Sequence, residues 1–112
     1  MRLYLKRKFA ASHKLDLPYA SKCGKLHGHT WVVEVWLEGP INEDGMVVDF
    51  QVIKEMIDTF DHTYLNDCIP FYNSGANPTA ENLALFFIRT IPHAIQVRVW
   101  ESEDAYAEEF RP

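Results

Sequence analysis

The sequence lacks several features that mark large classes of proteins. Among its 112 residues only Cys23 and Cys68 are cysteines, whereas a secreted chain of this size more often carries a dense set of disulfides. No segment approaches the roughly 20 apolar residues that a membrane-spanning helix needs, and the basic N-terminus is followed by no long apolar core. These absences predict a cytoplasmic protein with no membrane partner and no targeting signal.

Positive charge is also scarce in this chain. It has 11 Lys and Arg residues against 16 Asp and Glu residues, which gives a net charge of −5. Domains that bind nucleic acid usually carry a basic surplus that contacts phosphates, so no nucleic-acid partner is expected. A small anionic ligand is not excluded, because a few basic side chains can dominate the potential of one pocket.

Internal repeats, low-complexity tracts and interdomain linkers are absent as well. The composition is 47% hydrophobic and includes seven Phe and three Trp, which is sufficient for a packed core. We therefore expect a single domain over residues 1–112.

The first third of the chain contains two predicted strands. Residues 2–11 alternate apolar and charged side chains and predict a strand that ends near Ser12. Residues 13–28 contain one proline and two glycines and predict a loop. Residues 30–38 are dense in β-branched and aromatic side chains and predict a second strand. Residues 42–45 then predict a hairpin turn that leads to a short strand over residues 46–48.

Two helices and a final strand are predicted next. Asp49 is a suitable N-cap for a helix, and a loop is expected over residues 61–76. A second helix should begin around residues 77–79, where Asn77 or Thr79 can cap and Pro78 can occupy the first turn, and should end before Pro92. The first helix should pack on the sheet through apolar residues three or four positions apart, namely Phe50, Ile53, Met56, Ile57 and Phe60.

The predicted order of elements favours an α+β architecture. Residues 95–100 alternate apolar and polar side chains as a strand, which carries Glu101 at its end. Hairpin connections favour an antiparallel sheet with both helices on one face. Such a small sheet leaves exposed edge strands, and oligomerisation into a closed barrel is one way to cover them.

Two histidines separated by one residue, His27 and His29, indicate a metal site. In an extended segment, residues two positions apart project to the same side, so both imidazoles can bind one cation. Zinc needs three or four ligands, and His13 at the end of the first strand is a suitable third. Two alternatives remain open. The histidines could be unrelated loop residues, or Cys23 could be a fourth ligand that closes a structural site with no position for substrate.

Six sequence features follow one another along the chain. They are Phe9-Ala10-Ala11-Ser12-His13, Cys23-x₃-His27-Gly28-His29, Val48-Asp49-Phe50, Asp61-His62, Pro78-Thr79-Ala80-Glu81-Asn82 and Glu101. Together they resemble the 6-pyruvoyl-tetrahydropterin synthase superfamily. The spacing of three residues between Cys23 and the His-Gly-His segment is similar to that of the 6-carboxy-5,6,7,8-tetrahydropterin synthase branch, which belongs to queuosine biosynthesis.

The resemblance implies a fold and an assembly. The fold would be the T-fold, a four-stranded antiparallel sheet with two helices on one face. Subunits of the superfamily join edge to edge into a β-barrel, so a homo-oligomer, either a trimer or a hexamer, is expected, with active sites at subunit interfaces.

The resemblance also implies a reaction. The substrate would be 7,8-dihydroneopterin triphosphate, converted to 6-carboxy-5,6,7,8-tetrahydropterin with loss of acetaldehyde and triphosphate. Zn²⁺ would be the cofactor, held by His13, His27 and His29, and Cys23 would act as a general base. The remaining roles are a proton relay at Asp61 and His62 and a carboxylate at Glu101 that holds the pterin.

Some of these assignments have simpler structural alternatives. Asp61 and His62 could merely cap a helix C-terminus, and Glu101 could be an ordinary exposed residue. Thr79 and Glu81 could bind the pterin, or could cap a helix and complement its dipole. For the triphosphate, Lys14, Lys25 and Arg98 have suitable charge, without an assignment to the site. Activity of the 6-pyruvoyl-tetrahydropterin synthase type and a non-catalytic zinc module are the alternative functions.

Overall fold

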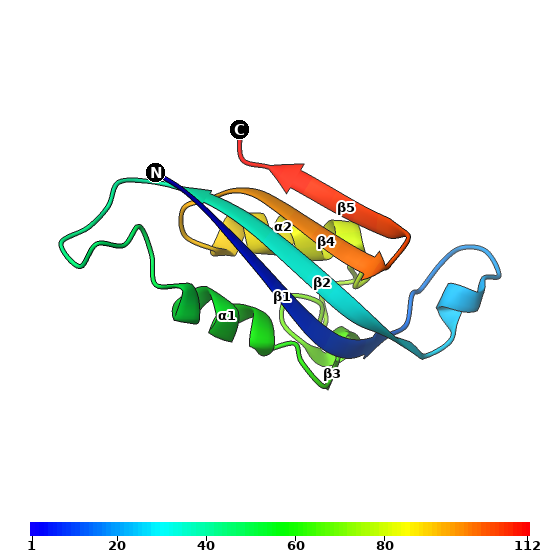
Figure 1. Ribbon diagram of the computed structural model, residues 1–112. Helices are drawn as coiled ribbons and strands as arrows, with labels where there is room; N and C mark the ends of the chain where they lie inside the picture. Colours follow the sequence, from blue (N-terminus) through cyan, green and yellow to red (C-terminus); the bar gives the residue numbers. More distant parts are fainter.

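A computed structural model describes the whole chain, residues 1–112. Its elements form one five-stranded sheet in the order β3-β1-β2-β4-β5 and two α-helices (Figure 1). The four long strands pair antiparallel, and the two-residue β3 pairs parallel to β1. The elements are β1 (Arg2–His13), β2 (His27–Glu38), α1 (Phe50–Asp58), β3 (Thr63–Tyr64), α2 (Ala80–Thr90), β4 (Ala94–Ser102) and β5 (Ala105–Phe110), with single-turn 3₁₀ helices at Lys22–Gly24 and Leu65–Asp67.

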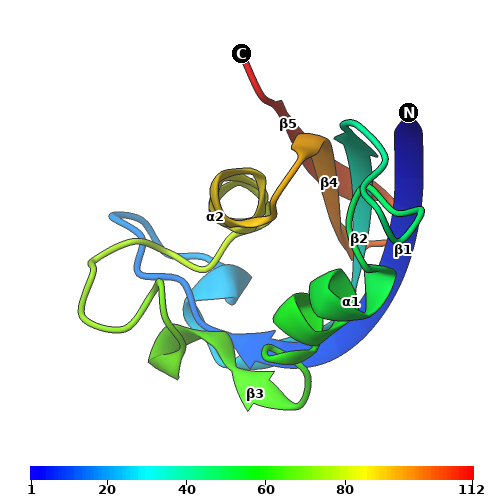
Figure 2. The same ribbon diagram turned by 90° about the vertical axis from the view of Figure 1, so that its left-hand side faces the viewer.

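Both helices lie on the concave face of the curved sheet (Figure 2), which confirms the predicted α+β arrangement. The strands alternate, so odd-numbered residues of β2 such as Trp31, Val33 and Val35 face the helices and are fully buried. Val97 and Val99 of β4 are buried on the same face. The sheet does not close on itself within one chain, and neither helix is long and apolar enough to cross a membrane.

The helix boundaries follow local capping signals. Asp49 accepts a hydrogen bond from the backbone N–H of Gln51 at 2.9 Å and caps α1, as predicted. Thr79 caps α2 by accepting from the N–H of Asn82 at 3.1 Å, so Pro78 lies before the helix instead of in its first turn. The placement of Phe50 in the core was wrong: at the start of α1 it is 40% exposed.

The strand predicted over residues 46–48 was wrong. The turn at residues 42–45 does form, with the N–H of Asn42 donating to the carbonyl of Met46 at 2.7 Å, but the chain then passes directly into the cap of α1. The fourth long strand is instead β5, in a segment that looked like an acidic tail. One of its carboxylates, Glu108, pairs across the two strands with Arg98 at 3.4 Å.

The predicted loop over residues 13–28 is shorter than expected. His13 is the last residue of β1, His27 is the first of β2, and the two are directly paired across the strands. The intervening connection covers residues 14–26. This extension of the antiparallel pair places the three histidines of the predicted metal site on regular strands, where their side-chain directions are fixed by the pleat.

Candidate metal centre and active site

The histidines continue the buried face of the sheet beyond the apolar core. On β1 and β2, the pair Phe9 and Trp31 is followed by Ala11 opposite His29 and then by His13 opposite His27. On β4, Glu101 lies two residues after the buried Val99 and therefore shares its face. The period-two alternation that builds the core thus directs three imidazoles and one carboxylate to the same side of the sheet.

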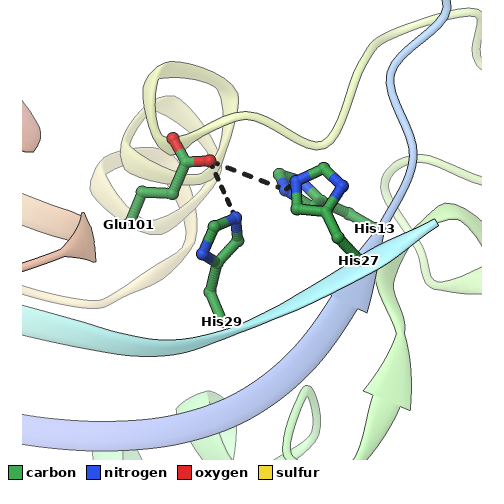
Figure 3. A group of neighbouring side chains, drawn as sticks. All are labelled: His13, His27, His29 and Glu101. Carbon is green, nitrogen blue, oxygen red and sulfur yellow. Dashed lines mark hydrogen bonds and ion pairs between the residues drawn. The ribbon is translucent and has the colours of Figure 1, made fainter. Parts of the chain in front are cut away.

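These four side chains converge on a small volume (Figure 3). His13 Nε2 lies 2.9 Å from His27 Nε2, and Glu101 Oε1 lies 3.0 Å from His29 Nε2 and 3.6 Å from His13 Nε2. All four donor atoms lie within 4.8 Å of one another. The predicted histidine triad is therefore assembled in one place, and Glu101 joins it.

Two of the imidazoles are oriented by backbone carbonyls. His13 Nδ1 lies 2.7 Å from the carbonyl oxygen of Pro78, and His27 Nδ1 lies 2.6 Å from that of Lys25. A carbonyl oxygen can only accept, so each Nδ1 carries the proton and each Nε2 presents a lone pair to the cluster. Metal-ligating histidines are commonly fixed in this way by a hydrogen bond from their other ring nitrogen.

Burial favours the neutral form of His13 and His29. Desolvation lowers the pKa of His13 below its ordinary value, although the hydrogen bond to Pro78 opposes the shift. Burial also lowers the pKa of His29, against the attraction of Glu101. Although His29 Nε2 is close to Glu101, the contact lacks hydrogen-bond geometry, which leaves this buried nitrogen without a hydrogen-bond partner. Neutral imidazole is the form that binds metals.

The donor set fits a divalent cation such as Zn²⁺. Two Nε2 lone pairs at 2.9 Å repel each other unless a proton or a metal cation lies between them. Three imidazole nitrogens, with or without a carboxylate oxygen, are a ligand set that zinc takes in proteins. The residues present could therefore hold the metal ion that the sequence motif predicts.

Comparisons with known proteins identify the family of this chain. A family model described as 6-pyruvoyl tetrahydropterin synthase matches residues 2–112. The chain belongs to this family. It is 39% identical over 108 residues to a putative 6-carboxy-5,6,7,8-tetrahydropterin synthase of Archaeoglobus fulgidus, with 89% of this chain and 87% of that protein covered. A protein of the same description from Pyrococcus abyssi is 36% identical over 138 residues, with 96% and 88% covered.

Solved structures show that the fold is the T-fold of this family. The 6-pyruvoyl tetrahydropterin synthase of Caenorhabditis elegans superposes with a TM-score of 0.77 at 24% identity, and the match covers 100% of this chain and 96% of that one. Membership of the family makes the chain an enzyme of the pterin lyase type, which confirms the resemblance noted in the sequence.

Cys23 lies outside the group of converging donors. It belongs to the 3₁₀ turn Lys22–Gly24, where its N–H donates to Ser21 Oγ at 3.1 Å and its carbonyl accepts from the N–H of Leu15 at 2.9 Å. Its thiol is half-buried and free.

The fourth donor beside the three histidines is Glu101. The sequence motif did not predict this position for Glu101. The alternation of Val97, Val99 and Glu101 along β4 is the one sequence signal that could have indicated it.

Asp61 and His62 form a pair at the edge of β1. Asp61 Oδ1 accepts from the N–H of Ala10 at 2.8 Å, and Oδ2 lies 2.9 Å from His62 Nδ1. The hydrogen bond from Ala10 is the main reason that the pKa of Asp61 is lowered. The cap of α1 is Thr59, so the pair is not a helix cap.

The imidazole of His62 is directed to solvent. Its backbone adopts the left-handed conformation, with φ of 58°, and its side chain is 84% exposed. His62 and His29 both line a shallow hollow of about 630 Å³ at this end of the sheet. Within one chain, however, the Asp61-His62 pair is not part of the donor group.

The start of α2 borders the histidine cluster. The carbonyl of Pro78 holds His13, and the next residue, Thr79, is occupied as the helix cap. Glu81 is exposed in the first turn, where its charge complements the helix dipole. Thr79 therefore caps the helix, and Glu81 is not part of the donor group.

The three basic residues suggested for the triphosphate lie in different places. Lys14 and Lys25 both line a hollow of about 440 Å³ along the connection between β1 and β2. Arg98 lies on the opposite face of the sheet, between the ring of Tyr106 at 4.3 Å and the carboxylate of Glu108 at 3.4 Å. Its even position on β4 directs it away from Glu101, so Arg98 does not belong with the cluster.

Proposed function

We propose that this enzyme is a zinc-dependent lyase of queuosine biosynthesis. It converts 7,8-dihydroneopterin triphosphate and one molecule of water to 6-carboxy-5,6,7,8-tetrahydropterin, acetaldehyde and triphosphate. The observation that carries this proposal is the convergence of His13, His27 and His29 on one point of the sheet face. The three-residue spacing from Cys23 to the His-Gly-His segment supports the choice of this branch, as do the names of the relatives.

The three histidines would hold Zn²⁺ through their Nε2 atoms. When bound, the ion supplies Lewis-acid polarisation of a substrate hydroxyl, which makes the neighbouring carbon-bound proton more acidic. The hydrogen bonds from His13 to Pro78 and from His27 to Lys25 keep the imidazoles oriented for this purpose. Burial of His13 and His29 maintains the neutral form of both rings.

Cys23 would act as the general base that removes this carbon-bound proton. The role needs thiolate at working pH, which a nearby cation favours. Asp61 and His62 would relay protons to and from Cys23, because the ionised carboxylate fixes the imidazole through Nδ1. His62 is exposed within one chain, which supports an active site completed at a subunit interface of a trimer or hexamer.

Glu101 would hold the pterin ring. Two carboxylate oxygens can accept at once from a ring N–H and the adjacent amino group. Thr79 and Glu81 lie in the segment that follows Pro78, so the start of α2 would border the bound pterin beside His13.

A product assay tests the proposed reaction. Purified zinc-loaded protein incubated with 7,8-dihydroneopterin triphosphate should release acetaldehyde and 6-carboxy-5,6,7,8-tetrahydropterin, both identified by mass spectrometry. Formation of 6-pyruvoyl-tetrahydropterin as the only product would reject this reaction in favour of the sister synthase activity. No consumption of the substrate would reject both.

A cysteine substitution distinguishes the enzyme from a structural zinc module. Cys23→Ala should retain zinc and reduce turnover by about 10²–10⁴-fold, the usual contribution of general-base catalysis. The matched control Cys68→Ala removes the other half-buried thiol and should leave both properties unchanged. Zinc loss in Cys23→Ala would instead identify Cys23 as a ligand of a closed site.

A further inference from the structure

Glu101 lies at an irregular point of the sheet. The pairing of β4 with β2 ends at Trp100, which is opposite Val32, and the register between β4 and β5 shifts between Trp100 and Ser102. Glu101 is therefore left without a directly opposed residue on either neighbouring strand. Such irregularities disrupt the ladder locally and often occur beside a functional site.

The carboxylate of Glu101 is directed into the histidine cluster (Figure 3). One oxygen, Oε1, lies 3.0 Å from His29 Nε2 and 3.6 Å from His13 Nε2, while the imidazoles approach from β1 and β2. Ligands of one tetrahedral zinc ion, bonded at about 2.0–2.2 Å, lie about 3.3–3.6 Å apart. One ion can therefore contact Oε1 and the imidazoles after small shifts of the side chains.

A second observation also indicates a cation at this point. His29 Nε2 is buried and makes no hydrogen bond, although buried nitrogen atoms nearly always have a partner. A cation bound beside Oε1 would be that partner. Cys23 is outside the group, so Glu101 is the fourth donor that the chain provides there.

We propose that Glu101 Oε1 is the fourth metal ligand of the substrate-free enzyme and that pterin binding releases this carboxylate to the ring. The release rests on the proposed function, since the pterin is the competing partner. A catalytic zinc site must keep or open one position, and a group of four protein donors is closed. Glu101 is the donor assigned to leave, because carbonyls anchor His13 and His27 and the His29 ring packs against Trp31, whereas no hydrogen bond holds the Glu101 carboxylate.

Metal affinity tests the ligand role without substrate. Zinc affinity of the full-length protein is measured by competition with a chromophoric chelator, and the coordination is followed by the visible spectrum of the Co²⁺-loaded protein. Glu101→Gln should bind zinc at least about tenfold more weakly, the lower range for loss of a group that supports a metal site, and should weaken the Co²⁺ bands. The matched control Glu103→Gln removes an equal charge two residues away at an exposed position.

The outcomes separate the ligand role from a general charge effect. Weaker zinc binding in Glu101→Gln alone supports the proposal. Wild-type affinity in Glu101→Gln, or an equal loss in both variants, overturns it. Circular dichroism of each variant verifies the fold.

Neopterin tests the release. The Co²⁺-loaded wild-type protein is saturated with neopterin, and binding is monitored by neopterin fluorescence. Saturation should shift the visible Co²⁺ spectrum. Saturation without a spectral change overturns the proposed release of Glu101 from the metal. Neither readout depends on turnover, so failure of the proposed reaction would be seen separately in the product assay.

Discussion

The helix-facing side of the sheet has two parts with the same geometry and opposite chemistry. In the core half, the inward positions of the strands are apolar, as at Phe9 opposite Trp31. In the site half, the next inward positions of the same strands are Ala11 opposite His29 and then His13 opposite His27. The alternation of the strands fixes direction in both halves, so the identity of the inward residue alone decides whether the position contributes to stability or to binding.

Trp31 is the boundary between the two halves. Its ring stacks on Phe9 with centroids 6.0 Å apart and meets the edges of His13 at 5.0 Å and His29 at 5.5 Å. Its indole N–H donates to the carbonyl of Ala11 at 3.3 Å. The core half therefore packs directly against the imidazoles of the site half through Trp31, which would limit their movement.

The largest expected effect is the loss of stability on removing the Trp31 ring. Trp31→Ala should lower the free energy of unfolding by about 3–5 kcal/mol, the usual cost of removing a fully buried tryptophan. Urea unfolding of the metal-free protein measures it. Trp36→Ala, on the opposite face of the same strand and half-buried, is the control and should cost less. Equal losses would contradict the distinction between the faces.

A histidine substitution in the site half should weaken zinc binding strongly and change the free energy of unfolding little. His27→Ala should weaken zinc binding by about 100-fold, at the upper range for disturbed metal sites. The half-buried ring contributes little to the core, so the unfolding free energy of the metal-free protein should change by about 0.5 kcal/mol or less. Chelator competition and urea unfolding measure the two quantities. The control His93→Asn alters an exposed histidine with positive φ and should leave zinc affinity unchanged.

Local signals in the sequence predicted much of the fold and the donor set. The β-branched run over residues 30–38 predicted β2, and Asp49 predicted the start of α1, because strand propensity and capping act over a few residues. The spacing of His27 and His29 predicted that both imidazoles lie on one side of the strand, because side-chain alternation is also a local property. These features needed no knowledge of distant contacts.

Features that depend on strand pairing were not predictable in this way. The acidic residues of β5 made the segment resemble an exposed tail, and the cross-strand partner of Glu108, Arg98 of β4, is known only from the pairing of the strands. The place of Glu101 in the cluster depends on the register of β4 against β2, and the position of Cys23 depends on the conformation of the connection over residues 14–26. Both are set by non-local structure.

A smaller effect is expected where α2 borders the site half. Thr79→Ala removes the cap hydrogen bond to Asn82 and should lower the free energy of unfolding by about 1 kcal/mol. Thr79→Ser retains the hydroxyl and should restore most of this loss. Thermal unfolding of the two variants measures the difference, and turnover by Thr79→Ser at the wild-type level would exclude a specific need for the threonine methyl group in pterin binding.

The last effect concerns pH and separates the halves without a substitution in the core. Burial holds the pKa of His13 and His29 below the ordinary value. As pH falls below about 6.5, the unfolded chain binds protons at these imidazoles more readily than the folded metal-free protein does. Protonation therefore stabilises the unfolded state relative to the folded state. Stability should be fully present above this pH and should decline below it, by at most about 1.4 kcal/mol per pH unit for each imidazole.

Urea unfolding of the metal-free protein between pH 7.5 and 5.5 measures this dependence. His29→Ala should have a shallower decline than the wild type because one buried imidazole is removed, whereas Trp31→Ala should be less stable at every pH with both imidazoles still present. A wild-type protein that becomes more stable on acidification would show that the metal-free cluster takes up protons more readily than the unfolded chain. In that case Glu101, which attracts a proton to His29, would outweigh the burial of the histidines.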